Sequence, residues 1–274
     1  MAAGRDFEKI VREFLNTSTP NVSDALDRLE INGAPHGIVP LWPECKKIFG
    51  PAATMKLVPV GEGLKSPSPA MGSLEAVVAA KPGDVLVIDH GGRIDANSYG
   101  GIVGFTTHHY GLAGCVVDGV VRDLDEYKEL GLPVYARGII QQSIRNRCEF
   151  AGHCIEVELG GVRVRPGDFI MADDNGVLVI PQGEVDKVLE LAMEYKAIEE
   201  KIVETIRRGD NPVEAHERVA KHYQVSSVYL AQELADQIAA KTMTWAQYGG
   251  THPKTPGNRL AADLCIQLLS HAWG

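Results

Sequence analysis

Apolar side chains recur at helical spacing in several parts of the chain. Near the N-terminus Phe7, Ile10, Val11 and Phe14 fall on one face and predict an amphipathic helix over residues 5–15. Similar spacing, with flanking start and stop residues, predicts helices over residues 21–29, 73–80, 99–110 and 184–208, and a short helix after Glu126 that ends at Gly131.

Shorter apolar runs, many rich in β-branched residues, predict strands between these helices. They cover residues 53–60, 85–89, 115–117, 133–136, 154–159, 162–164, 169–172 and 177–180. Gly160-Gly161 predicts a hairpin turn, and residues 34–50 and 139–153 are predicted to be largely loop. The strands and helices do not alternate regularly, so the pattern predicts an α/β fold with many short strands and not a doubly wound sheet.

The last part of the chain has a different character. Residues 212–222, 228–241 and 259–269 have helical patterns, with a break rich in Pro and Gly at 249–257. We therefore expect an α/β domain over residues 1–209 and a helical C-terminal extension over 210–274. The extension is too small for a catalytic domain, and we expect it to pack on the body or on a neighbouring subunit.

Composition narrows the class of protein. A formal net charge of −9 over 274 residues disfavours a nucleic-acid surface, which needs clustered Lys and Arg. The chain has no run of about 18 apolar residues, so no membrane span is expected, and its first ten residues do not resemble a signal peptide. Its five cysteines are scattered without a C-x-x-C pair, which favours free thiols and a cytoplasmic location.

The candidate chemistry lies between Gly100 and Glu126. A glycine-rich turn at residues 100–104 is followed by a predicted buried strand, a turn signal at Asp118-Gly119, and the pair Arg122-Asp123. Arginine binds carboxylates through paired N–H groups, and aspartate offers a hard oxygen to a divalent ion. The residues therefore suit an anionic substrate chelated to a metal. A purely structural alternative is that Asp123 caps a helix, with Glu126 as the acid at its third position.

In combination, these features resemble the class II pyruvate aldolases. The signature is Gly101, twenty residues, Arg122-Asp123, two residues and Glu126. Flanking segments at residues 21–26, 50–52, 81–84, 136–138 and 165–168 agree, and the resemblance covers roughly residues 17–208. These enzymes act on 4-hydroxy-4-methyl-2-oxoglutarate and 4-carboxy-4-hydroxy-2-oxoadipate, and they share a family with the regulator of ribonuclease E activity A. The resemblance implies a swivelling β/β/α domain assembled as a homotrimer or homohexamer.

The resemblance also implies a role for each residue of the candidate site. Asp123 would bind Mg²⁺ or Mn²⁺, and Arg122 would bind substrate and stabilise the developing enolate. The turn Gly100-Gly101 and the backbone N–H groups of Ile102 and Val103 would bind the substrate carboxylate. Glu126 would orient water on the metal. The family also uses an acid from the long C-terminal helix of an adjacent subunit; the candidates here are Glu199 and Glu200, although both also fit the solvated face of a helix.

The expected function is a metal-dependent lyase that releases pyruvate from a 4-hydroxy-2-oxo dicarboxylic acid and also decarboxylates oxaloacetate. One departure concerns Gly101, because several aldolases have an acid there that could assist the proton transfer of the aldol step. Two alternatives stay open. The chain could be a non-catalytic protein that inhibits a ribonuclease, as some family members do. It could also be a lyase on a sugar-acid-like substrate whose distal carboxylate meets Arg137, Arg145 or Arg147.

Overall fold

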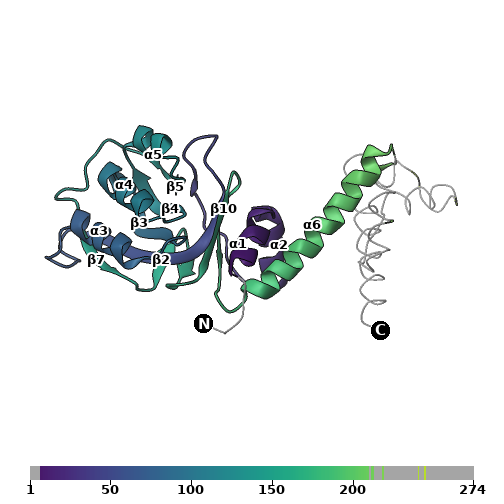
Figure 1. Cartoon of the computed structure of the whole chain (residues 1–274), viewed down its shortest axis with the longest axis horizontal. Helices are drawn as coiled ribbons and strands as arrows, with labels where there is room; N and C mark the ends of the chain where they lie inside the picture. The colour runs from purple at the N-terminus through teal and green to yellow at the C-terminus, as the bar shows by residue number, and fades with distance from the viewer. Residues whose placement is uncertain (1–6, 210, 213–217, 219–239, 241–243, 245–274) are drawn as a thin grey trace. The chain divides into compact units, whose positions relative to one another are not determined.

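A mixed β-sheet with helices on both sides forms the body of the protein (Figure 1). The structure, a computed structural model, describes residues 7–209 and positions 211, 212, 218, 240 and 244. The three helices predicted after residue 210 therefore lie outside the described residues. The described residues as far as Lys196 belong to one compact unit.

Four parallel strands make up the centre of the sheet. They are β2 (Ile48–Pro59), β3 (Val85–Asn97), β4 (Gly114–Val121) and β5 (Val134–Ala136), in the spatial order β5-β4-β3-β2. On one side β1 (Val39–Pro40) pairs antiparallel with β5, and on the other β10 (Phe169–Asp173) and β11 (Gly176–Ile180) continue antiparallel from β2. Strands β6 (Gly138–Ile139) and β7 (Cys148–His153) pair with β4 and β2, and β8 (Val157–Leu159) forms a hairpin with β9 (Val162–Val164).

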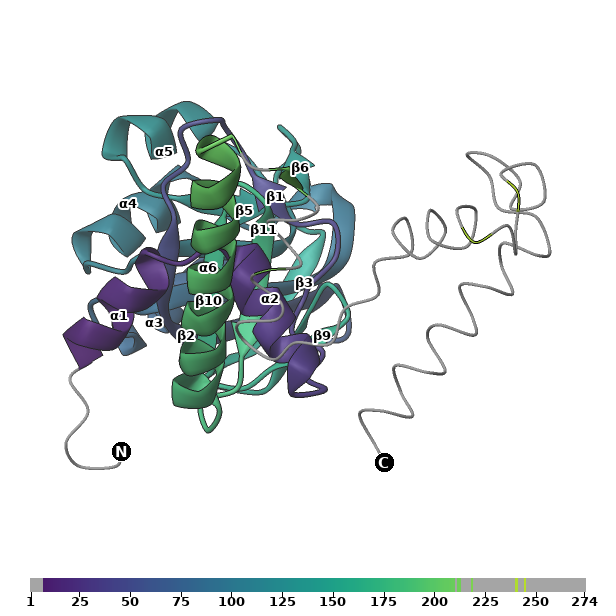
Figure 2. The ribbon, with the colours of Figure 1, turned by 90° about the vertical axis from the view of Figure 1, so that its right-hand side faces the viewer.

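The helices divide into two groups. Helices α3 (Pro69–Ala79), α4 (Gly101–His109) and α5 (Leu124–Leu130) connect the parallel strands, and α4 and α5 lie side by side in both views (Figures 1 and 2). Helices α1 (Phe7–Leu15), α2 (Thr19–Arg28) and the first half of α6 (Val185–Arg207) pack on β2, β10 and β11 through a second apolar cluster around Phe14 and Phe49. No helix among the described residues is long and apolar enough to cross a lipid bilayer.

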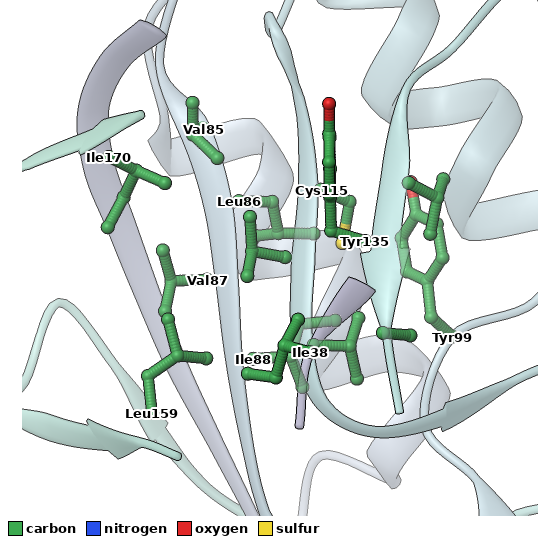
Figure 3. Packing of buried hydrophobic residues seen from close by; sticks show 14 of the residues in the cluster. Ile38, Val85, Leu86, Val87, Ile88, Tyr99, Cys115, Tyr135, Leu159 and Ile170 are labelled. Carbon is green, nitrogen blue, oxygen red and sulfur yellow. The ribbon is translucent and has the colours of Figure 1, made fainter. Parts of the chain in front are cut away.

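The main core explains why the central strands read as continuous apolar runs. Every residue of β4 is buried, and so are Val85–Ile88 of β3, because both faces of these strands are covered. Figure 3 shows side chains of β3 packed with Cys115, Tyr135 and Ile170 from neighbouring strands. The predicted α/β class with many short strands is confirmed.

Several sequence predictions were wrong in detail, and three of them change the picture of the fold. Asp118-Gly119 is not a turn: both residues lie inside β4, where Asp118 is buried in an ion pair with Arg137 and accepts a hydrogen bond from Gly160 N–H at 2.9 Å. The segment 139–153 is not all loop, since it contains β7 along the edge of β2. Helix α2 begins at Thr19 and not at Asn21, because Ser18 Oγ accepts from Asn21 N–H and Pro20 fits the first turn.

Candidate functional site

The start of α4 and the end of β4 lie next to each other because the chain segments before them are hydrogen-bonded. Ser98 N–H donates to Val120 O at 2.9 Å, and Arg122 N–H donates to Tyr99 O at 3.2 Å. Gly100 and the pair Arg122-Asp123 are consequently neighbours, although Gly101 and Asp123 are 22 positions apart in the sequence. The structure thus brings together the glycine turn and the Arg-Asp pair that the sequence singles out.

Asp123 caps a helix, but not the helix that its sequence position suggests. It stands just before α5 in a left-handed backbone conformation (φ 63°, ψ 41°) and makes no side-chain cap there. Instead, its Oδ2 accepts a hydrogen bond from Gly101 N–H, the first residue of α4, at 2.7 Å. Its Oδ1 has no hydrogen-bond partner among the described residues and is available to a ligand.

Arg122 lies against the same carboxylate. Its Nε is 3.4 Å from Asp123 Oδ2, and about 39% of its side chain is exposed. Within residues 7–209 this Nε is buried without a hydrogen-bond acceptor. The guanidinium as a whole is partly exposed beside a partly exposed carboxylate, and it is suited to bind an anion at this surface.

Glu126 closes the other side of the α4 N-terminus. A β-carbon built on Gly101 would lie 2.8 Å from Glu126 Oε1 and closer still to Oε2, so the carboxylate occupies the space of a side chain at position 101. A side chain at position 101 would have to displace the flexible end of Glu126, so the glycine that departs from the aldolase pattern leaves room for this carboxylate. Neither Gly100 (φ −136°) nor Gly101 has a left-handed backbone, so close approach and not an unusual turn explains the glycine at position 101.

The first turn of α4 leaves two backbone donors open. The first backbone hydrogen bond at the start of α4 runs from Gly104 N–H to Gly100 O. The N–H group of Gly101 donates to the Asp123 carboxylate. The N–H groups of Ile102 and Val103 have no acceptor in the described part of the chain. Because they stand at a helix N-terminus, these donors favour a negatively charged ligand.

Two buried tyrosines, which sequence reasoning did not single out, fix α4 and α5 together. The rings of Tyr99 and Tyr127 are 5.3 Å apart, and Tyr127 OH donates to Tyr99 O at 3.1 Å. Burial raises the pKa of the Tyr127 phenol well above its ordinary value, and the nearby charges of Asp123 and Glu126 add to this effect. The phenol therefore stays protonated and continues to donate to the backbone that leads into Gly100.

The carboxylate oxygens at this site fit a hydrated divalent ion. No group of three His, Cys, Asp or Glu side chains able to hold a metal occurs among the described residues. Asp123 Oδ1 is instead a single free carboxylate oxygen, with Glu126 close by on the same helix end. Mg²⁺ prefers oxygen ligands and usually keeps several waters, so one carboxylate is a sufficient protein ligand.

The remaining predicted residues lie elsewhere or have other partners. Glu199 and Glu200 are exposed on α6 beyond Lys196. Of the basic residues considered for a distal carboxylate, Arg137 is paired with Asp118, and Arg147 Nη1 binds the carbonyl oxygens of Ser143 and Arg145.

The contact between Gly101 and Glu126 predicts a coupled mutational effect. Gly101→Ala should reduce catalytic activity on the order of 10-fold or more, because the new methyl group must displace the Glu126 carboxylate from the site. In a Glu126→Ala background the same change should cost no further activity, since the space is then empty. Stability should stay equal or rise slightly, because Gly101 is the first residue of α4 and alanine restricts the unfolded chain more than glycine does. Kinetics and thermal unfolding of the four variants measure this coupling, and additive losses would contradict it.

Comparison with known proteins supplies the family. The RraA-like profile, described as Aldolase/RraA, matches residues 19–179. A protein of Halalkalibacterium halodurans with the provisional name 4-hydroxy-4-methyl-2-oxoglutarate aldolase is 35% identical over 190 residues, which cover 69% of this chain and 85% of that protein. Protein DlpA of Legionella pneumophila is 33% identical over 208 residues, but these cover only 33% of its length against 76% of this chain.

Solved structures agree with this assignment. A protein of Pseudomonas syringae pv. tomato superposes with a TM-score of 0.68 at 28% identity, covering 76% of this chain and 96% of that one. Streptomyces coelicolor RraAS2, described as an unusual member of the RNase ES inhibitor RraA protein family, gives a TM-score of 0.64 at 27% identity, covering 72% and 96%. The chain therefore belongs to the RraA-like family of aldolases and RraA proteins.

Proposed function

We propose that this protein is a divalent-metal-dependent lyase that cleaves a 4-hydroxy-2-oxo dicarboxylic acid to pyruvate and a second oxo acid. We include oxaloacetate decarboxylation among its activities. The observation that carries the proposal is the convergence of Arg122, Asp123 and Glu126 on the open N-terminus of α4. The relatives that carry the provisional aldolase name support the choice of reaction.

The hydrogen-bond donors of the site indicate the class of substrate. A 2-oxo acid presents a carboxylate and an adjacent keto oxygen in one plane. The open N–H groups of Ile102 and Val103 bind the carboxylate, where the positive end of the helix dipole also favours it. Arg122 binds the keto oxygen and stabilises the negative charge that develops on it during cleavage, when the interaction matters most.

Asp123 and Glu126 provide the acidic side of the site. Asp123 Oδ1 would hold Mg²⁺ or Mn²⁺, which when bound polarises the keto group and neutralises charge as a Lewis acid. Glu126 orients water beside Asp123 and is the nearest carboxylate for the proton of the C4 hydroxyl group. Decarboxylation of oxaloacetate requires no such base, so the same residues serve both reactions.

A second candidate function is inhibition of a ribonuclease without catalysis. The similarity to Streptomyces coelicolor RraAS2 favours it. The two functions are separated by measuring pyruvate release from 2-oxo acids, including 4-hydroxy-4-methyl-2-oxoglutarate, 4-carboxy-4-hydroxy-2-oxoadipate, oxaloacetate and sugar-acid-derived substrates. Release of pyruvate from at least one of them supports the lyase. Failure to turn over any, with inhibition of ribonuclease activity, supports the alternative.

We further propose a homotrimer or homohexamer, in which Glu199 and Glu200 reach the site of a neighbouring subunit. Both glutamates are exposed on α6, a helix of 23 residues, as this arrangement requires. Light scattering of the full-length protein should give three or six times the chain mass of 29.6 kDa. A catalytically active monomer at micromolar concentration would contradict the shared site and remove both glutamates from it.

A further inference from the structure

Asn97, the last residue of β3, has a buried side chain with no hydrogen bond among the described residues. The residue is only 3% exposed, and its Oδ1 is buried without a partner. Its backbone is well anchored, since Asn97 N–H donates to Gln142 O at 2.9 Å. Buried side-chain amides in native proteins are nearly always paired, and the described residues supply neither a donor to Oδ1 nor an acceptor to Nδ2.

The amide of Asn97 faces the candidate site. A β-carbon built on Gly100 would lie 3.7 Å from Asn97 Nδ2, 3.1 Å from Asp123 Oδ2 and 3.4 Å from Arg122 Nε. Three polar groups from two segments, the end of β3 and the pair Arg122-Asp123, therefore surround the β-carbon position of Gly100 at the start of α4. Arg122 Nε is buried without an acceptor in residues 7–209, and Asn97 Nδ2 donates to none of these residues.

A contribution to the stability of the fold does not explain why position 97 is an asparagine. An apolar side chain of similar shape would lose no hydrogen bond at this position and would avoid the cost of burying an unpaired amide. The adjacent residue shows the contrast: Ser98 is equally buried, but its Oγ donates to Val120 O at 3.0 Å. The unpaired amide is thus specific to the residue that faces Gly100.

We propose that Asn97 is a further substrate-binding residue, whose side-chain amide donates a hydrogen bond to the 2-oxo acid anion held between Gly100 and Arg122. This inference rests on the proposed lyase function. The amide is neutral, so it adds a directed donor to the site without attracting Asp123 away from its cap on Gly101. The bound anion accepts the hydrogen bond that Asn97 Nδ2 makes with no described residue, whereas Oδ1, itself an acceptor, is not a ligand of the anion.

Asn97→Leu tests this assignment in the full-length protein. Binding of oxalate, a planar mimic of the pyruvate enolate, is measured by calorimetry with Mg²⁺ present, alongside steady-state turnover and thermal unfolding. We expect oxalate to bind roughly 10- to 100-fold more weakly, the usual contribution of a hydrogen bond to a charged group. The KM of the substrate should rise by a similar factor, while the melting temperature stays equal or increases.

Ser98→Ala is the matched control, because it removes a neighbouring buried polar group that is already paired. It should leave oxalate affinity unchanged.

The possible results separate the inference from the proposed function. Unchanged oxalate affinity in a folded Asn97→Leu variant overturns the role of Asn97 and leaves the lyase untouched. If Asn97→Leu weakens oxalate binding but the wild type never releases pyruvate, Asn97 is supported as an anion-binding residue and the lyase is rejected. If the wild type binds neither oxalate nor any 2-oxo acid, both are rejected. An equal loss of affinity in Ser98→Ala would also overturn the assignment, since it would point to a general disturbance of this segment.

Discussion

Replacing Asp123 with asparagine is expected to reduce lyase activity by a factor on the order of 100 or more while leaving the protein folded. Asparagine tolerates the left-handed backbone at this position, and its carbonyl oxygen can still accept the hydrogen bond from Gly101 N–H. It cannot supply an anionic oxygen to Mg²⁺ or Mn²⁺, which bind carboxylates by preference. Turnover measured over a range of metal concentrations, together with thermal unfolding, tests the expectation.

Asp123→Ala provides the comparison that separates capping from metal binding. It should lose activity to the same extent, and it should also lose about 1–3 kcal/mol of stability, because alanine neither caps α4 nor favours a left-handed backbone. If Asp123→Asn retains full activity at saturating metal, the carboxylate serves only as a cap, and the assignment of Asp123 as the metal ligand is wrong.

Arg122→Lys is expected to lower kcat/KM by a factor on the order of 100, with little change in stability. Lysine keeps the positive charge but loses the planar arrangement of donors that binds neighbouring carboxylate and keto oxygens together. The side chain is about 39% exposed, so its replacement should disturb the core little. Arg163→Lys, at an exposed ion pair on β9, is the control for the loss of a guanidinium elsewhere. Near-normal turnover of Arg122→Lys would mean that any positive charge suffices.

Local sequence patterns predicted much of this structure. The buried run at residues 115–117 identified β4, and the glycine turn with Arg122-Asp123 identified the two segments that meet at the site. Gly160-Gly161 correctly indicated the β8–β9 hairpin, because both glycines adopt the positive φ angles that a two-residue hairpin loop favours. The hairpin signal is local, whereas the meeting of the glycine turn with Arg122-Asp123, 22 positions away, was predicted through the family resemblance.

The features that sequence reasoning missed depend on distant residues. Asp118 resembled a turn residue, since nothing nearby in the sequence shows that Arg137 neutralises it inside β4. The close approach at Gly101 comes from Glu126, a residue on the next helix of the chain. Asn97 carried no signal at all, because an unpaired buried amide becomes visible only when its surroundings are known.

The most direct test of the proposed function is pyruvate release from 4-hydroxy-4-methyl-2-oxoglutarate and from oxaloacetate by the full-length protein. It should be measured before chelation, after removal of divalent ions, and after restoring Mg²⁺ or Mn²⁺. We expect release that disappears with the chelator, returns with the metal, and is absent from Asp123→Asn under all three conditions. Release that persists unchanged after chelation, or that Asp123→Asn retains in full, would contradict a metal-dependent lyase centred on Arg122 and Asp123.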